Sequence, residues 1–250
     1  MQVTTRKPPT LGCGDLAAPL SRPTAERPLA GLTVLVIEDS RFAADAIRLL
    51  CLRSGARIRR ADSLKAAHRH LTTYCPDVII ADLGLPDGSG LDLIATLKNS
   101  APNAPIIIAT SGDDTLEGES LTAGADGFLP KPLASIAVFQ QAILAHFPPL
   151  GPTGLRAVSN ETVQPDPLAL HDDLKALRRH LASEATPTRD RAEYGAQFLA
   201  SLARTAGDEA LENKVESIRK SANEQGASQT AIKALTALVT NAFGPRPCSF

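Results

Sequence analysis

Tryptophan is absent from this chain of 250 residues, and aromatic residues of all kinds make up only 4% of it. Cysteine is scarce too. Its four positions, Cys13, Cys51, Cys75 and Cys248, include no Cys-x-x-Cys pair and have no histidine at ligand spacing. The usual structural zinc sites are therefore excluded, and no disulfide framework is indicated. We expect four reduced thiols in a cytoplasmic protein.

A large charge of one sign is also missing, because the formal net charge is −1. The composition does not favour a protein that binds nucleic acid or a membrane surface. Long hydrophobic runs are missing as well. No window approaches the roughly 18 apolar residues of a membrane-spanning helix, and the first residues lack the apolar stretch of a signal peptide. We expect no membrane contact.

Hydrophobic residues nevertheless make up 43% of the chain, enough for a packed core. Residues 1–30 contain five prolines without a hydrophobic period, so we expect a flexible tail. Residues 31–147 alternate between strand-like and helix-like segments. Residues 148–166 are rich in proline, glycine and serine and are interpreted as a linker. Residues 167–244 are helical in pattern throughout, and we interpret them as a C-terminal effector domain.

The alternating segment predicts an α/β domain. Strand-like apolar runs occupy residues 32–37, 57–60, 78–81, 106–109 and 127–129. Helix-like segments lie between and after them, at residues 41–54, 64–73, about 91–97, 115–123 and 133–145. This order is typical of a doubly wound, five-stranded parallel sheet covered on both faces. Such sheets bind their ligands beyond the carboxyl ends of the strands.

The C-terminal segment carries four apolar stripes at helical spacing. Breaks fall at Pro187, Gly207 and Gly226, and Gly244 with Pro245 ends the last stripe. Four short helices with short connections predict a small antiparallel bundle. The stripes consist of Leu170, Leu174, Leu177 and Leu181; Phe198, Leu199 and Leu202; Leu211, Val215, Ile218 and Ala222; and Ile232, Leu235, Leu238, Val239 and Ala242.

Acidic residues follow two of the predicted strands. Glu38 and Asp39 come after the first strand, and Asp82 comes after the third. The sheet would bring these carboxylates to one edge, where their repulsion calls for a cation. Oxygen ligands with an incomplete shell suit Mg²⁺. Lys131 and Thr110, after the fifth and fourth strands, add an ammonium and a hydroxyl, which together complete the groups of an aspartyl-phosphate site.

Four motifs carry a resemblance to a known family. They are VLVIEDS, VIIADLGLPDGSG, PIIIATSG and GADGFLPKP, and the resemblance that they carry covers residues 32 to about 147. The segment resembles the receiver domain of two-component response regulators, a flavodoxin-like fold. The resemblance implies that Asp82 accepts a phosphoryl group. It also implies that Asp39 binds Mg²⁺ directly, Glu38 binds it through water, and the carbonyl of Gly84 completes the protein's share of the metal shell.

The resemblance implies roles for further residues. Thr110 would hydrogen-bond the phosphoryl oxygens, and Lys131 would pair with them. Phe128 would turn inward as part of the switch, although it is also interpretable as an ordinary core aromatic residue. The bond between Lys131 and Pro132 would be cis. Gly84 and Gly112 depart from the family, because receivers usually carry side chains there that flank the phosphate, so the lifetime of the phosphoryl group stays open.

The implied partners are proteins. A sensor histidine kinase or a phosphotransfer protein would donate the phosphoryl group, and the receiver would promote its own phosphorylation and dephosphorylation. The C-terminal segment shows no motif of a separate output enzyme. Residues 151–250 hold 12 basic and 12 acidic residues, and no basic helix stands out. We therefore expect self-association or binding of a downstream signalling protein, with a divergent DNA-binding domain as the weaker alternative.

His171 supports a second alternative. A histidine on an exposed face of a helical bundle is how phosphotransfer domains carry a phosphoryl group, which would make the chain a relay intermediate. His171 lies beside the first apolar stripe, at the edge of the face that we expect to be buried. It lacks the small residues downstream that usually let a receiver approach. An ordinary surface histidine is the interpretation that we favour.

Overall fold

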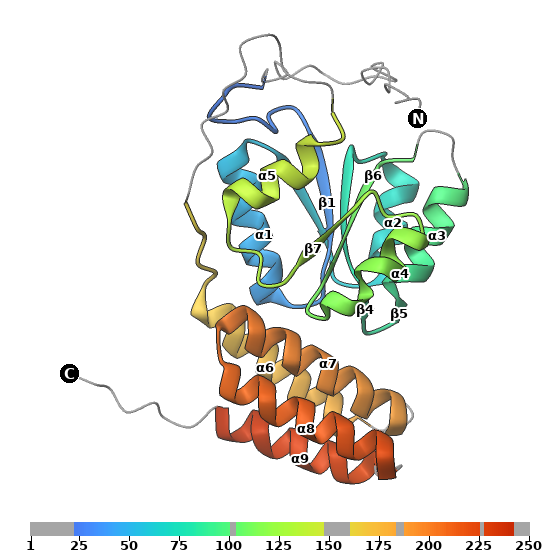
Figure 1. The fold of residues 1–250 in the computed structure, drawn as a ribbon, viewed down its shortest axis with the longest axis vertical. Coiled ribbons are helices and arrows are strands. Elements are labelled where there is room, and N and C mark those ends of the chain that lie inside the picture. The colour runs from blue at the N-terminus through green and yellow to red at the C-terminus, as the bar shows by residue number, and fades with distance from the viewer. Residues whose placement is uncertain (1–22, 101–103, 148–160, 184–187, 226–227, 243–250) are drawn as a thin grey trace, which may run out of the picture.

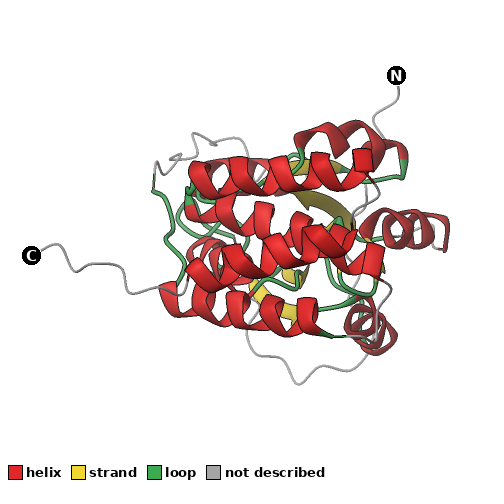
Figure 2. Ribbon diagram, turned by 90° about the horizontal axis from the view of Figure 1, so that it is seen from below, coloured by secondary structure: helices red, strands yellow, loops and turns green. Residues whose placement is uncertain are grey.

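The computed structural model describes residues 23–100, 104–147, 161–183, 188–225 and 228–242. In this part of the chain, a parallel sheet has helices on both faces, and four further helices lie side by side beyond one end of the strands (Figure 1). Seen from below, these four helices lie across the end of the α/β layers (Figure 2). Most of the expected N-terminal tail and of the expected linker lies outside the described residues.

The sheet has the strand order β2-β1-β3-β6-β7, with every neighbouring pair parallel. This order confirms the predicted doubly wound, flavodoxin-like fold. The strands begin and end within two residues of the predicted limits. Their bounds are Thr33–Ile37 for β1, Arg57–Ala61 for β2, Val78–Asp82 for β3, Ile106–Ser111 for β6 and Gly127–Pro130 for β7.

Continuous apolar runs form the middle of the sheet. Every residue of β3 and of β6 is buried, as expected for strands covered on both faces. The edge strand β2 instead exposes most of its residues. The central strands carry the acidic residues, so the best-packed part of the fold holds the candidate site in place.

Helices cover the two faces. They are α1 (Arg41–Ser54), α2 (Leu64–Thr73), α3 (Gly90–Ser100), α4 (Glu117–Thr122) with the 3₁₀ turn η1 (Asp114–Leu116) before it, and α5 (Ile136–Leu144). The hydroxyl of Ser40 accepts a hydrogen bond from the amide of Ala43 and so caps α1. Gly55 ends the same helix with a φ of 86°, which favours glycine. Both signals are local in sequence, and both ends of α1 were predicted.

The structure differs from the predicted boundaries at three places. A short hairpin of β4 (Gly84–Leu85) and β5 (Gly88–Ser89) follows Asp82, between the third predicted strand and the next helix-like segment. Leu29, assigned to the flexible tail, is fully buried in the core. Val163, assigned to the linker, is also buried there, and its amide donates to the carbonyl of Ala134. Apolar side chains thus extend the core of the α/β domain at both ends.

The C-terminal helices are α6 (Pro167–Ala182), α7 (Thr188–Ala206), α8 (Glu209–Gln225) and α9 (Ser228–Ala242). Gly207, with a φ of 71°, separates α7 from α8, whereas Pro187, Gly226, Gly244 and Pro245 lie outside the described residues. Residues from all four predicted stripes meet in one apolar cluster, which Phe42 of α1 joins. No helix of the described residues is both long and apolar enough to cross a bilayer.

Candidate functional site

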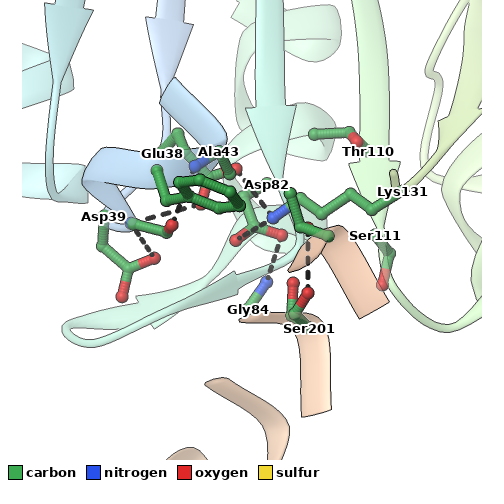
Figure 3. Close-up of polar contacts among 12 residues, drawn as sticks. Glu38, Asp39, Ala43, Asp82, Gly84, Thr110, Ser111, Lys131 and Ser201 are labelled. Carbon is green, nitrogen blue, oxygen red and sulfur yellow. Dashed lines mark hydrogen bonds and ion pairs between the residues drawn. The ribbon is translucent and has the colours of Figure 1, made fainter. Parts of the chain in front are cut away.

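Three carboxylates converge at the carboxyl ends of β1 and β3. Glu38, Asp39 and Asp82 each offer an oxygen, and these oxygens lie within 4.8 Å of one another. Glu38 and Asp82 are almost completely buried. The parallel pairing of β1 with β3 produces this arrangement, because it aligns Ile37 with Ala81, directly before the acidic residues. Figure 3 shows the carboxylates beneath the ends of their strands.

Lys131 reaches the same cluster from the loop after β7. Its Nζ lies 2.7 Å from Glu38 Oε2 and 3.0 Å from Asp82 Oδ2 (Figure 3). The Lys131 side chain is only 2% exposed, so the ammonium is removed from water. The peptide bond between Lys131 and Pro132 is cis.

Burial and mutual repulsion govern the charges of this cluster. Burial raises the pKa of Glu38 well above its usual value, and Asp82 raises it further while Lys131 opposes the shift. Burial, followed by the charge of Asp82, raises the pKa of Asp39 to about 7. Burial works to lower the pKa of Lys131, but the charges of Asp82 and Glu38 raise it above its usual value. One ammonium therefore does not fully compensate three carboxylates.

The donor set fits Mg²⁺. This ion prefers oxygen ligands and is commonly bound by one or two carboxylates that it shares with phosphate oxygens. Glu38 Oε2 pairs with Lys131, but the contact lacks hydrogen-bond geometry, and Oε2 has no other partner among the described residues. Asp39 and Asp82 supply further oxygens at the required spacing. A divalent cation would balance the charge that Lys131 leaves uncompensated.

Thr110 and Phe128 do not point into the carboxylate cluster. The Thr110 hydroxyl is buried and donates to the carbonyl of Leu129 at 2.8 Å, and in Figure 3 it lies away from the three carboxylates. Phe128 is partly buried and packs against the apolar cluster on the α2–α3 face of the sheet. The structure therefore places both residues beside the site, with Thr110 one strand away from Asp82.

Gly84 contacts Asp82 through its backbone amide. The amide donates to Asp82 Oδ1 at 3.3 Å, which ties the start of β4 to the candidate phosphoacceptor. The next close neighbour of Gly84 is the side chain of Gln197. A β-carbon added at Gly84 would lie 2.4 Å from Gln197 Nε2. The C-terminal helices thus reach the edge of the sheet that carries the carboxylates.

Two residues that the sequence analysis did not single out make direct contacts there. The hydroxyl of Tyr194, on α7, donates a hydrogen bond to Asp39 Oδ2. Asp173, on α6, accepts hydrogen bonds from the Ser40 hydroxyl at 2.8 Å and from the amides of Arg41 and Phe42 at 2.9 Å each. Asp173 therefore caps the first turn of α1 together with Ser40.

A weak signal for these residues exists in the sequence. Tyr194, Gln197, Ser201 and Arg204 are spaced by three, four and three residues, which places them on one face of α7. Their polar stripe lies beside the apolar stripe of Phe198, Leu199 and Leu202. Helical spacing reveals the stripe, but only the packed structure shows what it contacts.

His171 lies on α6 with its side chain exposed to solvent. The buried residues of this helix are Asp173, Leu174, Leu177 and Leu181. His171 is therefore outside the buried face, which agrees with a surface position at its edge. The structure does not place it among the carboxylates of the cluster.

Known proteins resemble the α/β part of the chain. Residues 34–143 match the family model of the response regulator receiver domain. The transcriptional regulatory protein PhoP of Escherichia coli K12 is 33% identical over 102 residues, which are 40% of this chain and 46% of PhoP. The virulence transcriptional regulatory protein PhoP of Salmonella typhimurium LT2 is 32% identical over the same length, with the same coverage. The chain thus spans about half the length of these curated relatives.

Solved structures include similar domains. A receiver domain of the Francisella response regulator 1452 is 27% identical, with a TM-score of 0.42, and the match covers 46% of this chain and 95% of that one. A beryllofluoride-activated NtrC4 receiver domain is 26% identical, with the same TM-score and the same coverage. The family match, in contrast, is direct and includes all the strands that carry the acidic cluster and Lys131. Residues 34–143 of this chain thus match the receiver domain of response regulators.

Proposed function

We propose that this protein is a response regulator whose Asp82 accepts a phosphoryl group in the presence of Mg²⁺. The observation that carries the proposal is the ion pair of Asp82 with Lys131 inside the cluster of Glu38 and Asp39. A buried carboxylate next to a buried ammonium and two further carboxylates has the groups that phosphoryl transfer needs. The donor would be a sensor histidine kinase or a phosphotransfer protein.

The chemistry is a transfer to oxygen. A carboxylate oxygen of Asp82 attacks phosphorus, the bond from phosphorus to the donor nitrogen breaks, and the nitrogen takes up a proton. When bound, Mg²⁺ would neutralise charge on the phosphoryl oxygens, with Asp39 and Asp82 as direct ligands, Glu38 through water and the Gly84 carbonyl as a further ligand. Lys131 would pair with the same oxygens. Water later attacks phosphorus and releases phosphate.

The charge of the phosphoryl group on Asp82 would then change the contacts of neighbouring receiver residues. Phosphorylation adds nearly two negative charges beside Lys131. Thr110 lies opposite Asp82 on the neighbouring strand β6, and its hydroxyl donates to the Leu129 carbonyl. We infer that Thr110 exchanges this carbonyl for a phosphoryl oxygen and that Phe128 follows, which would bias the loops around β6 and β7.

The output is proposed to be protein contact by the domain at residues 167–244. The curated relatives are named transcriptional regulators, yet the match covers less than half of their length. The segment 151–250 has as many acidic as basic residues, which does not support a DNA-binding surface. Self-association or binding of a downstream signalling protein fits the mixed charge better.

A relay through His171 is the second candidate, and its solvent exposure on α6 is the observation that favours it. A relay would leave an acid-labile, base-stable phosphoryl label on histidine after incubation with a phosphorylated donor. That label would disappear in His171→Gln. Its absence from the unmodified protein would remove the relay from consideration.

The proposed function is tested by phosphorylation of the full chain. We expect acetyl phosphate with Mg²⁺ to add one phosphoryl group, which borohydride reduction and peptide mapping would place on Asp82. Asp82→Asn should lose the label while keeping its fold. Asp114→Asn, at an acidic residue of η1 outside the cluster, should label like the unmodified protein. Undiminished labelling of Asp82→Asn would refute the proposal.

A further inference from the structure

Helix α7 has an apolar face and a polar face, and both make contacts within the protein. Its apolar face, which includes Leu199 and Leu202, packs in the core of the C-terminal helices. The polar stripe of Tyr194, Gln197, Ser201 and Arg204 turns toward the receiver instead. A polar face on a bundle helix ordinarily faces water. Here it meets the edge of the sheet that carries the carboxylates, and Figure 3 shows Ser201 of this helix below Asp82 and Gly84.

The stripe contacts the site at three successive points. Tyr194 donates to Asp39 at one end. The carboxamide of Gln197 lies over Gly84 in the middle. Ser201 and Arg204 lie over Gly112, after β6, at the other end. The contacts therefore run along the edge from the end of β1 past Asp82 to the end of β6.

The two glycines under the stripe make this approach sterically feasible. A β-carbon at Gly84 would lie 2.4 Å from Gln197 Nε2, and one at Gly112 would lie 3.0 Å from Arg204 Nη1 and 3.4 Å from the Cα of Ser201. Any larger residue at either position would need the helix or its side chains to shift. The absent side chains, which set this sequence apart from other receivers, leave the space that α7 occupies.

Helix α6 adds further contacts between the C-terminal helices and the receiver. Asp173 accepts hydrogen bonds from the first turn of α1. Phe42, in that turn, is 7% exposed and inserts into the core of the C-terminal helices. The receiver and the helices thus share a cap and a buried side chain next to the acidic cluster.

The covered edge is the one that a phosphodonor must reach. In-line transfer needs the donor on the open side of Asp82, but the Asp82 side chain is only 10% exposed. Both oxygens of Asp39 accept hydrogen bonds, Oδ1 from the amide of Ser40 and Oδ2 from Tyr194. A metal shell that includes waters needs room at this place.

We propose that the polar stripe of α7 is a docking surface for the phosphoacceptor edge of its own receiver and competes there with Mg²⁺ and the phosphodonor. The inference rests on the proposed function of Asp82. The docked helices keep the receiver closed, and phosphorylation requires and then stabilises their release. A released α7 exposes the stripe for the next protein partner.

The first test compares phosphorylation rates in full-length variants. Tyr194→Phe removes one hydroxyl from the stripe and keeps the ring, which packs against His180 and Phe198. With acetyl phosphate and subsaturating Mg²⁺, we expect Asp82 to label about tenfold faster, the factor for one lost hydrogen bond to a charged group. The other tyrosine of the chain provides the matched control, Tyr74→Phe, which should label at the unmodified rate.

A second pair of variants distinguishes release of the helices from a local effect on Asp39. Asp173→Asn weakens the cap on α1 without touching Tyr194, and we expect it also to speed labelling, by about fivefold or more. Its control, Asp172→Asn, alters only an exposed ion pair with Arg41 and should have no effect. Faster labelling of Tyr194→Phe alone would indicate a local effect and overturn the docking proposal.

The outcomes distinguish the two proposals. Labelling of Asp82 at equal rates in all variants would overturn docking and leave the phosphoacceptor function intact. Absence of any labelling on Asp82, in the unmodified protein and in every variant, would refute the function and with it the competition. Faster labelling in Tyr194→Phe and Asp173→Asn, but not in their controls, supports both.

Tyrosine fluorescence provides a readout that does not depend on rates. The chain has no tryptophan and only two tyrosines, so Tyr74→Phe leaves Tyr194 as its single fluorophore. We expect acetyl phosphate with Mg²⁺ to change the emission of Tyr194 as its hydroxyl leaves Asp39. The change should be absent when Asp82→Asn is added. Unchanged emission in a protein that is fully phosphorylated would contradict release.

Discussion

Lys131 sets the charge balance of the acidic edge. It is buried between Glu38 and Asp82, and its ammonium is the cation closest to both carboxylates in the described residues. Removing one partner of a buried ion pair leaves a charge without compensation, which costs far more than the loss of an exposed pair. The chain contains a matched example for comparison, Lys98 with Asp126, at 2.5 Å but with side chains 18% and 27% exposed.

We expect Lys131→Ala to lower the free energy of unfolding by about 3–5 kcal/mol at pH 7 in metal-free buffer. Lys98→Ala should lower it by about 1 kcal/mol or less. Urea denaturation followed by circular dichroism measures both changes. Equal losses in the two variants would contradict the assigned role of Lys131.

The loss of unfolding free energy in Lys131→Ala should depend on pH. The native pKa of Glu38 is already raised, and without Lys131 it rises further above the unfolded value of about 4.3. Below that value the carboxyl is protonated in both states and its penalty disappears. As pH rises, the unfolded state releases its proton first, so the native state loses stability. The deficit should therefore be larger at pH 7 than at about pH 4.

At the scale of elements, α1 shows how one helix joins the two parts of the chain. Its cap by Ser40 and its end at Gly55 are sequence-local, so both could be predicted. Asp173 accepts three further hydrogen bonds from the same turn. It lies 132 positions after Arg41 in the sequence. Local patterns carry no information about such a partner, because the contact exists only after the helices pack.

We expect Asp173→Ala to lower the free energy of unfolding by about 1–2 kcal/mol, as for the loss of a helix cap. Asp172→Ala should change it by about 0.5 kcal/mol or less, because its ion pair with Arg41 is exposed. Asp172 and Asp173 are consecutive residues of α6, so the two substitutions differ mainly in the contact that each removes. Hydrogen exchange should show the loss of protection in the first turn of α1, and an equal effect of the two substitutions would refute the capping role.

At the scale of the whole molecule, the two parts share a core residue. Phe42 belongs to a receiver helix but packs in the apolar cluster of α6–α9. We expect Phe42→Ala to cost about 3 kcal/mol of unfolding free energy and to increase hydrogen exchange in α6 and α7. Leu168→Ala, at a side chain 72% exposed, should have little effect. Unchanged exchange in α6 would show that the shared contact does not hold the helices.

The receiver could be predicted from the sequence more fully than its interface with the C-terminal helices. The strands, their order and the meeting of Glu38, Asp39, Asp82 and Lys131 follow from apolar runs and from motifs that are local in sequence. The contact of Tyr194 with Asp39 could not be predicted, because it depends on how one packed unit lies against another. Gly84 and Gly112 were visible as departures, but their effect on packing needs the position of α7.

The binding of Mg²⁺ at the acidic edge is the claim on which the proposed chemistry depends. Thermal denaturation with increasing Mg²⁺ measures it directly. At a concentration tenfold above the dissociation constant, the ion should stabilise the unmodified protein by about 1.4 kcal/mol. Asp62→Asn, at an exposed aspartate outside the cluster, should keep this gain, and Asp39→Asn should lose it. Equal stabilisation of the unmodified protein and Asp39→Asn would contradict the account.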